Sequence, residues 1–148
     1  MNMPADAGMF FWVDEMDEKK KPQRVLVVDD DMLIREVLKA ILRSEGFKVV
    51  GEAKDGEGGI AQTGLLRPDA VCLDVSMPGM SGLDALKVLR EKFPEVHVVM
   101  ITGDASTATV RDAVTFGAAG YIIKPFNAKR VSAALRAAFK PPSDSPFS

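Results

Sequence analysis

Apolar and polar residues alternate along the middle of the chain in five similar units, each a short apolar run followed by a stretch with helical spacing. The predicted strands cover residues 24–28, 47–52, 70–73, 96–101 and 119–123. The predicted helices cover residues 32–45, 56–66, 83–92, 106–116 and 128–139. Short, continuously apolar runs are typical of strands that are buried on both faces of a sheet. Five strand–helix units in a row therefore predict an α/β fold, a parallel sheet with helices on both faces.

The first predicted helix has an amphipathic pattern. Apolar residues that we expect to face the sheet recur at helical spacing: Leu33, Ile34, Val37, Leu38, Ile41 and Leu42. Charged residues that we expect to face away lie between them: Arg35, Glu36, Lys39 and Arg43. Gly46 follows as the C′ glycine that ends this helix. The second helix is predicted to be weak, because Gly58, Gly59 and Gly64 each cost about 1 kcal/mol relative to alanine.

Composition and charge restrict the class of protein. Of 148 residues, 47% are hydrophobic and 27% are charged, which suits one globular domain with tails. The net charge of −2 does not indicate a nucleic-acid-binding protein, which is usually strongly basic. Apolar runs stay well short of the roughly 20 residues that span a bilayer. The single cysteine, Cys72, cannot form an intramolecular disulfide and is compatible with a reducing compartment, so we expect a cytoplasmic protein.

The predicted domain covers residues 23–140, between an extension at 1–22 and a Pro/Ser-rich tail at 141–148. The extension contains three adjacent aromatic residues, Phe10, Phe11 and Trp12, followed by a dense run of charges. Two interpretations remain open: a disordered arm, or a segment whose aromatic side chains dock on the domain or on a partner. The tail is expected to be a frayed end.

Residues that carry chemistry follow four of the five predicted strands: Asp29, Asp30 and Asp31, then Asp74, Thr102 and Lys124. Open α/β sheets bind ligands at the carboxyl ends of their strands, so we expect these side chains to cluster at one edge. Clustered carboxylates repel one another unless a hard cation such as Mg²⁺ neutralises them. A carboxylate such as Asp74 can then attack a phosphoryl group and form an acyl phosphate. Lys124 and Thr102 would contact the phosphoryl oxygens, which is most of what phosphoryl transfer needs from a protein.

Four motifs carry a resemblance to a known family: VLVVDDD, DAVCLDVSMPGMSG, VVMITG and GAAGYIIKPF. In this order, each at a strand end, they resemble the receiver domain of two-component response regulators, of the stand-alone chemotaxis-regulator (CheY-like) type. The resemblance covers nearly all of the predicted domain. It implies a single doubly wound, flavodoxin-like domain with a five-stranded sheet of order 2-1-3-4-5 and five helices. It also implies a phosphoacceptor rather than an enzyme, with only its own phosphoryl transfer and slow autodephosphorylation.

The resemblance assigns roles to individual residues. Asp74 would be the phosphoacceptor, with Lys124 as phosphate partner and Thr102 as switch hydroxyl. Tyr121 would be the rotating aromatic of the switch, and Pro125 would follow a cis peptide bond. The implied ligands of Mg²⁺, with Mn²⁺ as an alternative, are Asp29, Asp30, Asp74 and the main-chain carbonyl of Ser76.

Other residues have a structural interpretation. Asp31 is predicted to be the N-cap of the first helix, where it adds to the negative electrostatic field of the site but does not bind the metal. Cys72 is expected to be an inert core thiol, and His97 an ordinary strand residue at the end of the sheet opposite the acids. Tyr121 could also be a half-buried strand aromatic that never moves. In receivers, the positions of Ser76 and Asp104 tune how fast the phosphoryl group is lost.

The expected function is phosphorylation-dependent signalling. A sensor histidine kinase or histidine phosphotransfer protein would phosphorylate Asp74. The face formed by residues 106–116 and 119–139 would then contact an unknown target protein or a second copy of the chain, as a homodimer. Nucleic acid and membrane are not expected among the partners.

Two other functions remain as alternatives. A phosphoaspartate hydrolase of the haloacid-dehalogenase kind needs a second aspartate two residues after the nucleophile, where this chain has Ser76. A DNA-binding transcription factor needs an output domain, and we expect none because the last predicted helix lies so close to residue 148.

Overall fold

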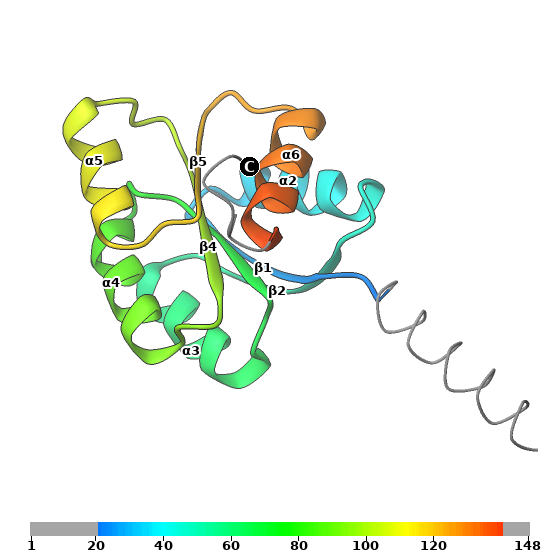
Figure 1. Ribbon diagram of the computed structural model, residues 1–148, viewed down its shortest axis with the longest axis horizontal. Coiled ribbons are helices and arrows are strands. Elements are labelled where there is room, and N and C mark those ends of the chain that lie inside the picture. The colour runs from blue at the N-terminus through cyan, green and yellow to red at the C-terminus, as the bar shows by residue number, and fades with distance from the viewer. Residues whose placement is uncertain (1–20, 141–148) are drawn as a thin grey trace, which may run out of the picture.

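The computed structural model describes residues 21–140, in which five strands alternate with five helices (Figure 1). The strands are β1 (Arg24–Val28), β2 (Lys48–Ala53), β3 (Ala70–Leu73), β4 (His97–Thr102) and β5 (Gly120–Ile123). The helices are α2 (Met32–Ser44), α3 (Gly56–Leu66), α4 (Gly82–Lys92), α5 (Thr107–Thr115) and α6 (Ala128–Phe139). Each predicted element is present, with boundaries that differ by at most one residue.

All neighbouring strands are parallel, and their order is β2-β1-β3-β4-β5. Helices α3, α4 and α5 cover one face of the sheet, while α2 and α6 cover the other (Figure 1). This confirms the predicted doubly wound, flavodoxin-like α/β fold. The strand order reverses between β1 and β3, so the carboxyl ends of these two strands form the position where such folds bind ligands.

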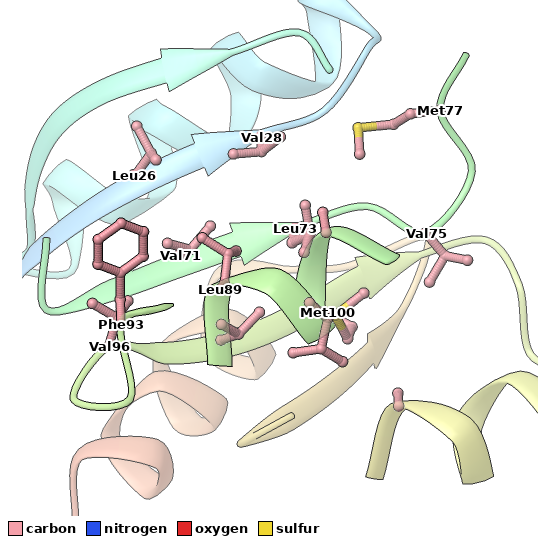
Figure 2. Packing of buried hydrophobic residues seen from close by; sticks show 14 residues of the cluster. Leu26, Val28, Val71, Leu73, Val75, Met77, Leu89, Phe93, Val96 and Met100 are labelled. Carbon is pink, nitrogen blue, oxygen red and sulfur yellow. The ribbon is translucent and has the colours of Figure 1, made fainter. Parts of the chain in front are cut away.

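Side chains of the central strands alternate between two cores, one on each face of the sheet. Leu26 and Val28 of β1 point into the core beneath α3 and α4, where Figure 2 shows them with Leu73, Leu89 and Met100. Val25 and Val27 point into the core beneath α2 and α6. Residues 25–28 are at most 1% exposed, which explains why their sequence is apolar without alternation.

Helix α2 is rotated relative to the prediction. Leu33 and Val37 were expected to face the sheet, but they are 69% and 42% exposed. Lys39 was expected to face away, but it is only 9% exposed. The stripe that packs on the sheet is narrower than the six predicted positions and centres on Leu38 and Leu42. The Lys39 ammonium is tolerated beside this stripe because it is paired with carboxylates.

The glycine-rich helix α3 packs closely on the sheet. A Cβ added at Gly59 would lie 3.0 Å from a methyl carbon of Val28, so the missing side chain lets the helix approach β1. Asp55 caps this helix by accepting a hydrogen bond from the Gly58 amide at 2.7 Å. The glycines that lower helix propensity thus serve tertiary packing.

None of the helices within residues 21–140 is long and apolar enough to cross a membrane. The predicted tail at 141–148, and the extension except for residues 21 and 22, lie outside the described residues. The two interpretations of Phe10, Phe11 and Trp12 therefore stay predictions.

Candidate functional site

Three carboxylates meet at the carboxyl edge of the sheet. Asp29 follows β1 and Asp74 follows β3, and the amide of Asp74 donates to the main-chain oxygen of Val28 at 3.1 Å. Carboxylate oxygens of Asp29, Asp30 and Asp74 all lie within 4.8 Å of one another. Asp29 is 3% exposed and Asp74 is 4% exposed, whereas Asp30 is exposed to solvent. The predicted acid cluster therefore exists, with two buried members and one on the open side.

Lys124 provides positive charge to this cluster. Its Nζ donates to Asp29 Oδ2 at 2.8 Å and to Asp74 Oδ2 at 3.3 Å. Lys124 follows β5, which β4 separates from β3, and its long side chain still reaches Asp74. Two carboxylates at the 4.8 Å limit of this cluster repel by about 3.5 kcal/mol at an effective dielectric of 20, and closer ones repel more. One ammonium among three carboxylates leaves the cluster net negative.

The electrostatics of the cluster shift two of its pKa values. Burial raises the pKa of the Asp29 carboxyl, and the Asp74 charge adds to this, against hydrogen bonds from Lys124 and the Asp31 amide. Burial alone would lower the pKa of the Lys124 ammonium, but the hydrogen bond to Asp29 and the charge of Asp74 raise it on balance. Lys124 is thus held in its charged form, while Asp29 still carries a cost of burial that a further cation would offset.

The three adjacent acids have different roles in the structure. Asp31 is the N-cap of α2, as predicted: its Oδ1 accepts hydrogen bonds from the amides of Leu33 at 2.9 Å and Ile34 at 3.3 Å. The Asp31 amide in turn donates to Asp29 Oδ1 at 2.9 Å. This turn places the Asp29 carboxylate toward Asp74, while Asp31 points into the helix.

The loop after β3 holds Asp74 through main-chain contacts. The Ser76 amide donates to Asp74 Oδ1 at 3.2 Å, and the Gly82 amide donates to the Val75 oxygen at 2.8 Å. A Cβ added at Gly82 would lie 1.9 Å from the main-chain oxygen of Asp74, so only glycine fits where α4 begins. Gly82 was not among the predicted site residues, although a glycine directly after the N-cap Ser81 is a signal of close approach. The role of the Ser76 carbonyl as a metal ligand stays a prediction.

Thr102 and Tyr121 both contact the loop between β4 and α5. Thr102 is fully buried between the strands that carry Asp74 and Lys124, and its Oγ1 accepts a hydrogen bond from the Asp104 amide at 3.3 Å. The Tyr121 hydroxyl donates to the main-chain oxygen of Asp104 at 2.6 Å. Hydrogen bonds from Ser106 and Thr109 to the Asp104 carboxylate lower its pKa. The predicted switch residues are therefore linked through one loop residue, and their movement stays a prediction.

The end of β5 is held by the main chain. The Lys124 amide donates to the Thr102 oxygen at 2.8 Å, which continues the pairing of β4 with β5 as far as the site. The Lys124–Pro125 peptide bond is cis, the geometry that the resemblance implied.

One charged residue that was predicted to lie outside the site contacts its backbone, and a second charged residue holds the first. Arg35 Nη1 donates to the main-chain oxygen of Asp29 at 2.7 Å, and Arg35 Nε donates to Glu52 Oε1 at 2.8 Å. Arg35 was expected to face away from the sheet. The signal that could have identified it is an opposite charge, Glu52, near the end of the strand that neighbours β1.

Cys72 and His97 lie away from the site, as expected. Cys72 is buried within β3, and burial raises the pKa of its thiol to about 12. His97 begins β4 at the opposite end of the sheet, where its ring packs edge-on against Phe139 with centroids 5.3 Å apart.

Comparison with known proteins identifies the family. Residues 25–136 match the family described as the response regulator receiver domain. The chain belongs to this family. It is 39% identical over 117 residues to the chemotaxis protein CheY of Listeria monocytogenes, which covers 79% of this chain and 98% of that protein. It is 42% identical over 126 residues to the DNA-binding response regulator MtrA of Mycobacterium tuberculosis, which covers 84% of this chain and 54% of MtrA.

A solved receiver domain has the same fold. The structure titled as the CheX-CheY-BeF3-Mg complex of Borrelia burgdorferi matches with a TM-score of 0.78 and 31% identity, covering 81% of this chain and 91% of that chain. That complex contains CheX, BeF3 and magnesium together with CheY. Receiver domains take a phosphoryl group from histidine kinases, and they are phosphoacceptors rather than true enzymes. The cluster of Asp29, Asp30 and Asp74 is typical of their magnesium site.

Proposed function

We propose that this receiver domain is a single-domain response regulator that accepts a phosphoryl group on Asp74 from a histidine kinase or a histidine phosphotransfer protein, in a reaction that depends on Mg²⁺. The clustering of the Asp29, Asp30 and Asp74 carboxylates carries the proposal, together with the bonds from Lys124 to Asp29 and Asp74. Carboxylate oxygens are the ligands that Mg²⁺ prefers, and the buried pair still lacks a full counter-charge, so this donor set fits the ion.

The proposed transfer uses residues that already surround Asp74. A carboxylate oxygen of Asp74 attacks phosphorus; the O–P bond forms, the N–P bond of the phosphohistidine breaks, and its electron pair returns to the imidazole nitrogen. Lys124 leaves its Asp29 contact to hold a phosphoryl oxygen, and the Thr102 hydroxyl donates to another. When bound by Asp29, Asp30, Asp74 and the Ser76 carbonyl, Mg²⁺ supplies charge neutralisation to the phosphoryl oxygens.

The signal is proposed to leave through α5, β5 and α6. Phosphorylation replaces a carboxylate by a group of about −1.5 to −2 charge, which attracts Lys124 and the Thr102 hydroxyl. The hydrogen bonds of Thr102 and Tyr121 to Asp104 support a coupling of that movement to the loop before α5. The altered face would bind a target protein or a second copy of the chain. We expect this to happen in the cytoplasm, without nucleic acid or membrane as a partner.

Phosphorylation by acetyl phosphate tests the assignment of Asp74. The protein with Mg²⁺ should gain one phosphoryl group by intact mass, which hydroxylamine removes because the product is an acyl phosphate. Asp74→Asn and Asp74→Ala should both abolish the label, and EDTA should prevent it. Asp31→Asn is the matched control, since it removes an adjacent charge but keeps an N-cap side chain. Labelling that persists in both Asp74 variants would overturn the proposal.

A further inference from the structure

Arg35 connects the acid pair to the neighbouring strand. Its guanidinium donates from Nη1 to the main-chain oxygen of Asp29 at 2.7 Å and from Nε to the Glu52 carboxylate at 2.8 Å. The Arg35 side chain is only 14% exposed, so water competes weakly for these bonds. A planar guanidinium with both bonds formed has little freedom to turn.

The bond to Asp29 fixes the peptide unit that joins the two acids. The Asp29 carbonyl and the Asp30 amide belong to one planar peptide, so holding the carbonyl also sets the direction in which Asp30 leaves the strand. The Asp29 amide donates to the Ala53 oxygen at 3.1 Å, so Asp29 is held on both sides. Within residues 21–140, the exposed Asp30 carboxylate has no hydrogen bond or ion pair, so the backbone is what places it.

The guanidinium reaches the Asp29 carbonyl without adding net charge to the acid cluster. Glu52 accepts hydrogen bonds from both Arg35 and Lys39, and Lys39 also pairs with Glu36. These two cations and two anions sum to zero. The network therefore supplies a strong donor to the backbone while leaving the field of the carboxylates available for a cation.

We propose that Arg35 is a positioning residue for the cation site, acting through the Asp29–Asp30 peptide, and that Glu52 balances its charge. The inference rests on the proposed function, because it assumes that Asp29 and Asp30 bind a divalent cation. Residues that orient metal ligands typically contribute 10- to 100-fold in metal affinity.

Titration with Mn²⁺ alone, read as free Mn²⁺ by electron paramagnetic resonance, measures this affinity without any phosphorylation. Arg35→Met should raise the dissociation constant about tenfold or more. Lys39→Met is the matched control: it removes the same charge from the same network and keeps the Arg35–Asp29 bond, so it should not raise the constant. Both variants make the surroundings more negative, which by itself would tighten binding of a cation. Weaker binding in Arg35→Met alone therefore supports positioning rather than charge.

Glu52→Gln tests the balance of charge. It keeps a side chain that can accept from Arg35 but leaves the guanidinium uncompensated, so Mn²⁺ should bind several-fold more weakly at low salt. The screening length falls from about 10 Å at 0.1 M to 3 Å at 1 M salt, so the difference from wild type should shrink at high salt. The defect of Arg35→Met should persist there.

Two further measurements separate the possible outcomes. Circular dichroism of each variant establishes that it is folded. If Arg35→Met does not fold, Arg35→Lys replaces it, because a single ammonium cannot hold both Glu52 and the Asp29 carbonyl. An unchanged Mn²⁺ dissociation constant in Arg35→Lys would overturn the inference. A folded Arg35→Met that binds Mn²⁺ as tightly as wild type also overturns it. Asp30→Asn should abolish Mn²⁺ binding. If this variant binds Mn²⁺ as wild type does, the proposed metal site itself is wrong. If Asp30→Asn loses Mn²⁺ binding and Arg35→Met does not, only the role of Arg35 is refuted.

Discussion

Gly82→Ala changes the contact between α4 and the backbone that carries Asp74. The added Cβ would lie 1.9 Å from the Asp74 main-chain oxygen and 2.6 Å from the Val75 Cα, whereas a Cβ almost never comes closer than 3.0 Å to another heavy atom. The helix and the loop must therefore separate by about 1 Å. Both sides of this contact are main chain, so no side chain can rotate away to relieve it.

The expected cost is near the upper end of the range for overpacking, about 3 kcal/mol. Helix propensity acts in the opposite direction, since alanine inside a helix is favoured over glycine by up to about 1 kcal/mol. The net loss in free energy of unfolding is then about 2 kcal/mol. For a domain of this size, such a loss lowers the melting temperature by roughly 6–10 °C.

Urea unfolding followed by circular dichroism measures this loss. Gly103→Ala is the matched control, because a Cβ there meets no atom within 4 Å, and its stability should stay within about 1 kcal/mol of wild type. Where Gly82→Ala is still folded, acetyl phosphate should label Asp74 more slowly, because the clash displaces the Asp74 backbone. A Gly82→Ala variant at least as stable as wild type would show instead that helix propensity outweighs the close contact.

Three other outcomes follow from the structure. The only thiol, Cys72, has a pKa raised to about 12 by burial, so Ellman's reagent at pH 8 should modify it only on unfolding; rapid modification of the native protein would contradict this. Asp31→Ala should lose about 1 kcal/mol of stability, because it removes the N-cap of α2, but its affinity for Mn²⁺ should stay within about threefold of wild type. A loss of Mn²⁺ affinity as large as that of Asp30→Asn would contradict the assignment of Asp31 as a cap and Asp30 as a metal ligand. Hydrogen bonds from Lys39 and Arg35 lower the pKa of Glu52 from its ordinary value of 4.5. The ionised Glu52 therefore stabilises the folded protein above pH 4.5, and this contribution is lost as the pH falls through the lowered pKa of the folded state. Glu52→Gln should therefore lose less stability than wild type between pH 7 and pH 3, and an identical loss in urea midpoints would count against this.

The fold could be predicted because apolar runs report burial, and a parallel sheet is buried on both faces. Burial and strand pairing are nevertheless different properties. Phe47 and Val96 are 7% and 2% exposed and were predicted to begin strands, yet pairing begins one residue later in each case, at Lys48 and His97. Both side chains belong to the hydrophobic core although their residues precede the first paired residue of the strand. A prediction from the hydrophobic pattern alone therefore starts each strand one residue too early.

The acid cluster and Lys124 could be predicted because strand topology brings the residues after β1, β3 and β5 to one edge. Arg35, Glu52 and Gly82 could not be predicted in the same way, because their roles depend on how α2 and α4 are rotated and how closely they approach the loops. A narrow packing stripe left Leu33 and Val37 exposed. The same rotation turned Arg35 toward Asp29 and Glu52.

The charges at the edge explain why three acids and one lysine occur together. Asp29, Asp30 and Asp74 with Lys124 sum to −2, which a single divalent cation neutralises. Conversion of Asp74 to an acyl phosphate replaces −1 by about −1.5 to −2 and makes the sum more negative. Under the proposed function, the phosphoryl group would therefore strengthen cation binding, and by linkage the cation would favour the phosphorylated form to the same extent. Lys124 Nζ donates to Asp29 at 2.8 Å and to Asp74 at 3.3 Å, so it lies between the proposed metal ligand Asp29 and the proposed phosphoacceptor Asp74. Under the proposed function, a more negative Asp74 would draw the Lys124 ammonium away from Asp29 and toward Asp74, and so pass a change of charge at the end of β3 to the residue that follows β5.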